Sequence, residues 1–213
     1  MKGKVFVVII IAILGFIIYR SCKVVPIEQA EKGFNPRKYA QKVWVKLLEN
    51  MDSLQTVDAV EVLNALDKDP EKAHEKFAKI VGVSNYRYYL VKGTGEIVSI
   101  QDDGFTLKIR ENRDKPDFFV TTHIFGNSIA NSTGIIKMED FDRINDFNLV
   151  STALNGIVRE EVALSFLKQL KEMARGEGSL VKFLGVFTLL RDEEVKYPLE
   201  LIPLRLELVR GGF

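Results

Sequence analysis

The sequence predicts an α+β fold in which helices at the front of the chain pack with an antiparallel sheet that one long helix interrupts. Three observations predict it. Apolar residues recur at helical spacing over residues 36–82, short β-type runs begin after residue 86, and a helical pattern returns over 146–175. An apolar leader stands before all of these. The predicted parts are a signal peptide or membrane anchor at 1–22, a connector at 23–35, a helical unit at 36–82 and a β-barrel-like unit at 83–213, the last two packed as one domain.

The leader has the plan of a secretory signal. Lys2 and Lys4 precede the uninterrupted apolar run 5–19, and Cys22 follows directly after Ser21. As a helix, this run would span only about 22 Å, which is short for a membrane span and favours a signal peptide. Cys22 in this place suggests lipidation of its sulfur and cleavage just before it. An uncleaved anchor helix and a buried helix of a soluble domain remain as alternatives.

Both a lipidated Cys22 and an uncleaved anchor would hold the rest of the chain beside a membrane. We expect the domain on the extracytoplasmic, periplasmic side of the cell membrane. The chain has 30 Lys and Arg and 29 Asp and Glu, and the leader holds three of the basic residues. The remaining 27 basic and 29 acidic residues leave a net charge of −2. Such a domain lacks the basic surface that nucleic-acid binding requires.

The helical unit follows from start signals and apolar spacing. Asn35 and Pro36 are typical of a helix start, and one apolar face then holds Ala40, Val43, Trp44, Leu47, Leu48 and Met51. A second helix is predicted over 56–66. Asp69 and Pro70 predict the start of a third, which we expect to end at Gly82.

The β-type runs are predicted at 87–91, 95–100, 105–110, 118–125, 180–190 and 199–209. Asp103 and Gly104 predict a hairpin between the second and third runs, and we expect a tight turn or bulge at 93–95. About five strands with the long helix 146–175 before the fourth are compatible with a small OB-like Greek-key barrel. An open six-stranded sheet would leave a similar trace.

Several motifs, in order along nearly the whole chain, resemble a family of predicted periplasmic lipoproteins known as domain of unknown function 2291. The motifs are Ser21-Cys22-Lys23-Val24-Val25-Pro26-Ile27, Gly33-Phe34-Asn35-Pro36, Leu90-Val91-Lys92-Gly93-Thr94-Gly95, Phe183-Leu184-Gly185-Val186-Phe187 and Ile202-Pro203-Leu204-Arg205-Leu206. The resemblance implies an envelope protein, usually a lipoprotein, often encoded near sugar transport systems. It implies no assigned activity and no catalytic residues.

The polar segment 126–134 is the candidate ligand-binding loop, because it follows a predicted strand and is rich in amide and hydroxyl side chains. Its candidate residues are Asn127, Ser128, Asn131, Ser132 and Thr133. The same side chains could instead cap their own backbone. Tyr86 and Tyr88 should share one face of a strand, opposite Tyr89, and an exposed aromatic pair could stack on a ligand.

The two histidines are the remaining candidates for chemistry. We expect His74 on a solvated helix face and His123 in a strand, where it could meet Asp140 or Asp142. The sequence lacks phosphate-loop and serine-hydrolase motifs, so it predicts no catalytic residue, metal or cofactor.

The sequence therefore predicts a membrane-tethered, non-catalytic binding or accessory protein of the envelope. Its expected partners are the membrane, through the leader or a lipid on Cys22, and either transporter subunits or a carbohydrate. One alternative is an envelope hydrolase or transferase with a site near His123, and another is a purely structural protein. A pocket joining His123, an acid and a serine would favour the enzyme, whereas exposed aromatic residues beside 126–134 would favour binding.

Overall fold

The computed structural model describes residues 34–173 and 176–209, and the described residues from Pro36 onward form one compact unit, to which the description below applies. The leader and Cys22 lie outside the described residues, so the predictions made for them stay predictions. Within the described ranges, none of the helices combines the length and the apolar character that crossing a membrane requires.

Helix α3 spans Pro36–Asn50, and the short 3-10 helix η1 spans Met51–Ser53. The predicted apolar face of α3 is largely confirmed, with Leu48 as an exposed exception. This face packs on α7 (Ile144–Val158). The indole nitrogen of Trp44 donates a hydrogen bond of 2.6 Å to the carboxylate of Glu161, which lies just beyond the end of α7.

Helices α4 (Ala59–Lys68) and α5 (Pro70–Phe77) follow a two-residue strand, β1 (Val57–Asp58). Both helices begin at an aspartate cap: the side chain of Asp58 accepts from the N–H of Glu61, and that of Asp69 from the N–H of Lys72. The expected end of α5 at Gly82 is wrong. Beyond Phe77 the backbone turns extended, because Lys79 forms a β-bridge with Tyr88.

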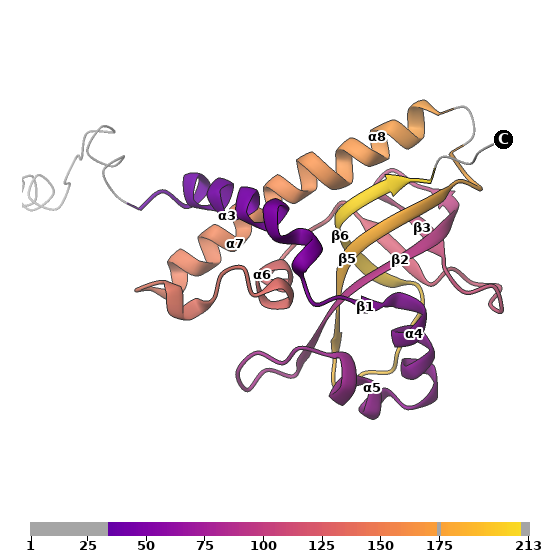
Figure 1. Ribbon diagram of the computed structural model, residues 1–213, viewed down its shortest axis with the longest axis horizontal. Coiled ribbons are helices and arrows are strands. Elements are labelled where there is room, and N and C mark those ends of the chain that lie inside the picture. The colour runs from indigo at the N-terminus through magenta and orange to yellow at the C-terminus, as the bar shows by residue number, and fades with distance from the viewer. Residues whose placement is uncertain (1–33, 174–175, 210–213) are drawn as a thin grey trace, which may run out of the picture. The chain divides into compact units, whose positions relative to one another are not determined.

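Five longer strands form the barrel: β2 (Tyr86–Ile100), β3 (Gly104–Lys108), β4 (Phe118–Thr121), β5 (Leu180–Leu190) and β6 (Leu199–Leu208). Their order is β2-β3-β4-β6-β5, and β5 pairs back onto β2, so the sheet closes. Strand β1 adds to β2 in parallel, and β4 pairs with β6 in parallel. The OB-like Greek-key barrel is confirmed, and the open sheet is not (Figure 1).

Strand β2 is continuous where the sequence predicted two runs with a turn between them. Gly93 pairs with Phe183 inside the ladder, and a Cβ on Gly93 would lie 3.0 Å from the Phe183 ring and 3.3 Å from Ala59. This close approach explains why residue 93 is a glycine, and a turn is not required to account for it. The predicted hairpin after β2 is confirmed, and the N–H of Gln101 donates to the carbonyl of Gly104 across it.

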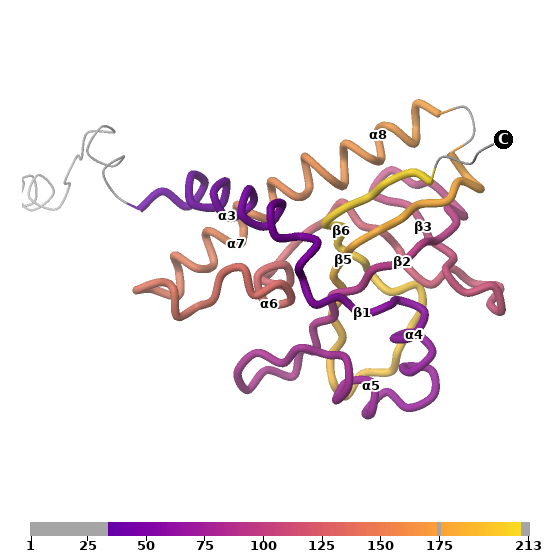
Figure 2. Tube along the Cα trace, in the orientation of Figure 1, coloured from indigo at the N-terminus to yellow at the C-terminus, as the bar shows by residue number. Residues whose placement is uncertain are grey.

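Between β4 and β5 the chain forms α6 (Ser128–Thr133), the 3-10 helix η2 (Met138–Asp140) and then a long rod. The rod is the predicted long helix, in three parts: α7 (Ile144–Val158), the π-helical η3 (Arg159–Leu164) and α8 (Ser165–Glu172). Figure 2 shows it as one trace that runs past the barrel.

The domain has two apolar cores. The first fills the barrel, with Phe105, Leu107, Phe118 and Val120 pointing inward, and is covered at one end by α8 and at the other by α4 and α5 (Figure 1). The second lies outside the barrel, where α3, α6 and α7 cover outward residues of β2, β5 and β6, including Leu90, Val186 and Leu204. The candidate site lies at the edge of this second core.

Candidate groove beside helix α6

The predicted ligand-binding loop is largely a helix. Residues 128–133 form α6, which Gly134 ends with a left-handed φ of 67°. Ile129 and Ala130 are buried in the outer core and hold the helix against the barrel. The prediction of a loop is wrong because these two apolar residues pack inward, so that the polar residues on either side of them take up helical positions.

The five candidate polar residues divide into two groups. Ser132 is buried, with no hydrogen-bond partner for its hydroxyl among the described residues, and the hydroxyl of Thr133 donates a hydrogen bond of 2.7 Å to the carbonyl of Ile129, so neither lines the groove. Asn127, Ser128 and Asn131 line a groove of about 540 Å³ instead. Three of the five residues thus lie where a ligand could reach them.

Aromatic side chains line the groove as well. Tyr86, Tyr88 and Phe125 line it, and Tyr86 and Phe125 are 48% and 77% exposed. The rings of Tyr86 and Tyr88 lie on one face of β2, with centroids 6.3 Å apart, whereas Tyr89 points into the barrel and stacks on Phe187. The predicted division of these tyrosines between two faces is confirmed. An exposed aromatic ring such as Phe125 can pack on the apolar face of a ligand.

Hydrogen bonds fix the polar wall before any ligand arrives. Thr188 on β5 donates to the hydroxyl of Ser128 over 3.1 Å, and the amide of Asn127 donates to Asn148 over 3.1 Å. The side chain of Asn155 donates to the carbonyl of Gly126 over 2.8 Å and so holds the turn that carries Phe125. The groove is therefore preorganised.

Glu193 is the charged residue that lines the groove, so the groove offers hydroxyl and amide groups together with a carboxylate. These groups can donate hydrogen bonds to a neutral polar molecule and accept hydrogen bonds from it. It would repel a phosphate or another anion.

A family described as predicted periplasmic lipoprotein (DUF2291) matches residues 12–207. The chain belongs to this family. An OB-fold protein from Thermotoga maritima with a known crystal structure is 63% identical to this chain in sequence. The two structures align with a TM-score of 0.80, and the match covers 83% of this chain and 99% of that one. None of the curated proteins matches.

Membership of this lipoprotein family confirms the resemblance found in the motifs and supports an envelope-associated location. The OB-fold relative agrees with the barrel described above. In OB folds the face of the second and third strands commonly binds ligands, and in this family member those strands are β3 and β4. The groove beside α6 lies instead on β2 and β5, the first and fourth barrel strands.

The sequence predicted His74 on a solvated helix face. This prediction is wrong, because His74 is buried. Its Nδ1 is hydrogen-bonded to the hydroxyl of Tyr89 inside the barrel end that α5 covers. Burial lowers the pKa of His74 below its usual value and raises the pKa of Tyr89 above its own. This pair belongs to the core of the domain and not to its groove.

His123 lies just beyond the end of β4 and is mostly exposed. Its imidazole is 3.9 Å from the carboxylate of Asp103, and it makes no ion pair with Asp140 or Asp142. Among the described residues, no serine is hydrogen-bonded to this ring, and no cluster of His, Cys, Asp or Glu could hold a metal ion. The arrangement expected of a hydrolase near His123 is therefore not assembled in this part of the chain.

Sequence reasoning missed the part of the groove that β5 supplies. Tyr88 pairs with Thr188 and Tyr86 with Leu190, so strand pairing across about a hundred residues of chain closes this wall. No local motif marks Thr188. Only the closure of the barrel brings it to Ser128.

Proposed function

We propose that this protein is a membrane-tethered, non-catalytic binding module of the envelope, and that the groove beside α6 binds a carbohydrate. The observation that carries the proposal is the placement of exposed Tyr86 and Phe125 beside the amides of Asn127 and Asn131. Exposed aromatic residues beside the polar segment 126–134 are the feature that favours a binding module over an enzyme.

A sugar ring fits this chemistry because it has an apolar C–H face and a rim of hydroxyl groups. The face can pack on an aromatic ring, and the rim can exchange hydrogen bonds with amides and a carboxylate. Asn127, Asn131 and Glu193 supply such groups around Phe125. The groove volume of about 540 Å³ lies within the usual range for small-molecule sites.

A titration of the full chain with glucose, xylose, maltose and cellobiose, followed by calorimetry, tests the proposal. We expect at least one of them to bind, and Phe125→Ala to weaken that binding by about fivefold or more, since a stacked aromatic contact contributes roughly 1 kcal/mol beyond its buried area. Val98→Ala is the control, because Val98 on β2 is also an exposed apolar residue but does not line the groove.

If the Phe125→Ala variant binds the sugar with the same affinity as the wild type, the proposed site is wrong. An absence of binding for all four sugars would contradict the carbohydrate proposal and favour the purely structural alternative. The link to a sugar transport system rests on the family resemblance alone and stays a prediction.

The tether has its own test. Mass spectrometry of the mature protein from membranes should find a chain that begins at a diacylglycerol-modified Cys22, and Cys22→Ala should abolish that species. An intact, unmodified chain would contradict lipidation and support the anchor-helix alternative.

A further inference from the structure

The loop between α5 and β2 exposes an unusual amount of apolar surface. Ile80, Val81 and Val83 are 52%, 39% and 106% exposed, and Gly82 turns the chain between them with a φ of 60°. Figure 1 shows the loop projecting from the barrel at the lower left. A contiguous exposed apolar surface of this kind is typical of a site that contacts a membrane or another protein.

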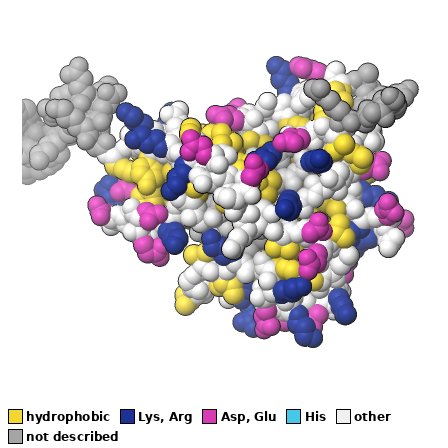
Figure 3. Space-filling view, in the orientation of Figure 1, with side chains coloured by type: hydrophobic (Ala, Val, Ile, Leu, Met, Phe, Trp, Pro, Cys, Tyr) yellow, Lys and Arg dark blue, Asp and Glu magenta, His cyan; other side chains and the backbone are white. Residues whose placement is uncertain are grey.

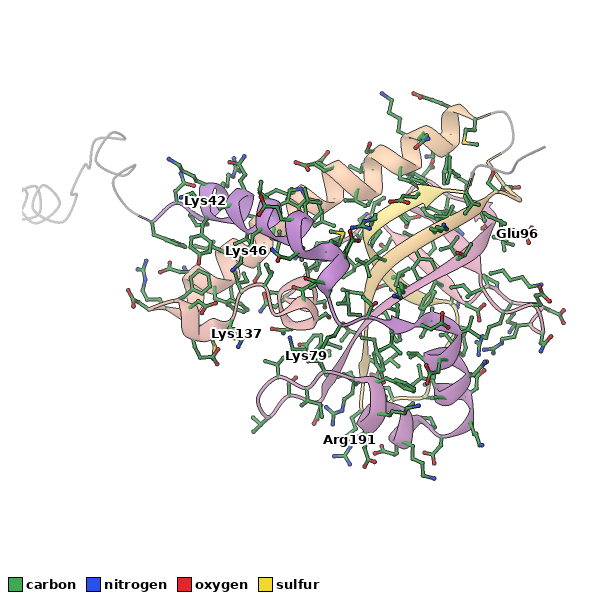
Figure 4. All side chains as sticks on the ribbon, in the orientation of Figure 1. Lys42, Lys46, Lys79, Glu96, Lys137 and Arg191 are labelled. Carbon is green, nitrogen blue, oxygen red and sulfur yellow. The ribbon has the colours of Figure 1, made fainter. Side chains whose placement is uncertain are left out.

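Four lysines lie on the same half of the domain as this loop. Lys42 and Lys46 are one turn apart on α3, Lys79 stands at the base of the loop, and Lys137 follows α6 (Figure 4). Figure 3 shows basic side chains beside the yellow loop tip. None of the four ammonium groups makes an ion pair within the described ranges, although Glu139 is close to Lys137 in the chain.

Lys79 and Lys137 also lie close enough to repel each other. Burial and the charge of Lys137 lower the pKa of Lys79, whose ammonium group is 3.5 Å from the backbone carbonyl of Ser132. Two neighbouring cations without a carboxylate partner would be stabilised by an external anion.

We propose that the loop 80–83 and the lysines at 42, 46, 79 and 137 form a surface that lies on an anionic lipid membrane. Apolar side chains enter the boundary between headgroups and acyl chains, and the ammonium groups bind lipid phosphates. The inference rests on the tethering part of the proposed function and is independent of the groove.

The connection to the leader supports a membrane as the partner. Thirteen residues, 23–35, separate Cys22 from α3, and even fully extended they reach only about 45 Å. The first helix of the domain, which carries Lys42 and Lys46, must therefore stay close to the bilayer that holds the leader or the lipid. A membrane surface would then be within reach of these lysines.

The test uses the full chain with Cys22→Ser, reconstituted through its apolar leader into vesicles of phosphatidylcholine with or without phosphatidylglycerol. In the test variant, Val83→Cys, an environment-sensitive dye is attached to the new cysteine. In the control variant, Glu96→Cys, the same dye is attached at position 96, because Glu96 lies at the opposite end of the domain (Figure 4). We expect the dye at position 83 to shift to shorter wavelength and to be quenched by brominated lipids, and the dye at position 96 to remain unchanged.

Lys79→Glu combined with Lys137→Glu should reduce the quenching at position 83 in the anionic vesicles. If the protein floats with the vesicles and the dye at position 83 stays in water, the membrane-contact surface is wrong although the tether holds. Failure of the protein to float at all would overturn this surface and the leader as an anchor, whereas the lipid on Cys22 has its own test in the mass spectrometry above. Sugar titration in the same samples reports on the groove separately.

Discussion

Two groups of charged residues in this domain are organised in opposite ways. Around Arg110, at the barrel end that α4 covers, each charge has a close partner of opposite sign. The lysines at 42, 46, 79 and 137 have no such partner among the described residues. The contrast indicates that the first group stabilises the closed barrel, whereas the second is available for contact with other molecules.

The Arg110 network joins three separate segments. Its guanidinium lies 2.7 Å from both Asp117 and Asp67, and Asp117, which is fully buried, also accepts from the backbone N–H groups of Ile109 and Arg110. Tyr197 donates to Asp67 over 2.7 Å, and Arg113 lies over the Tyr197 ring. Helix α4 and the loops after β3 and β5 are thus held together.

Titration in this network follows from the same contacts. Burial would raise the pKa of Asp67, but the hydrogen bond from Tyr197 and the charges of Arg110 and Arg113 lower it below its usual range. Burial and the bond to Asp67 raise the pKa of Tyr197 to about 12. Asp67 therefore stays ionised, and Tyr197 stays neutral, at physiological pH.

The largest effect is expected from Asp117→Asn. It leaves the buried Arg110 with Asp67 alone, and breaking a buried ion pair costs about 3–5 kcal/mol. The free energy of unfolding, measured by denaturant titration, should fall by an amount of this order. Phe125→Ala, at the exposed groove, should change it by less than about 0.5 kcal/mol. Equal effects of the two variants would contradict the distinction between the regions.

A smaller effect is expected from the buried histidine. Because burial lowers the pKa of His74 in the folded state, the unfolded chain binds the extra proton first, and stability is lost as the pH falls through 6.5 toward the folded-state value. His74→Gln removes the titration and can still hydrogen-bond to Tyr89.

The unfolding free energy of the His74→Gln variant should therefore depend less on pH below 6.5 than that of the wild type, by at most about 1.4 kcal/mol per pH unit. The measurement is a set of denaturant titrations between pH 7 and pH 5. Parallel pH profiles for the two proteins would show that His74 does not titrate differently on folding.

Local signals predicted much of the fold. Asp69 and Pro70 placed the start of α5, Asp103 and Gly104 placed the hairpin, and the run 180–190 coincides with β5. In each case the residues that decide the structure are neighbours in the chain. Such features can be predicted because caps and hairpin turns depend on a few adjacent residues.

Features that depend on distant contacts were missed. Gly93 looked like a turn because its partner Phe183 is remote in sequence, and 126–134 looked like a loop because the core that buries Ile129 is formed by other elements. The groove was predicted in part: its Asn and Ser residues and the face shared by Tyr86 and Tyr88 were visible in the sequence. Its wall on β5 was not.

The measurement that tests the central claim most directly is an NMR titration of the full chain with the sugar that binds best. Amide and methyl shifts should concentrate at Tyr86, Phe125, Asn127, Asn131 and Thr188, the residues of the groove. Shifts that concentrate instead on β3 and β4 and on the loop 101–103 would show that the sugar uses the face common in OB folds, and would contradict the groove beside α6.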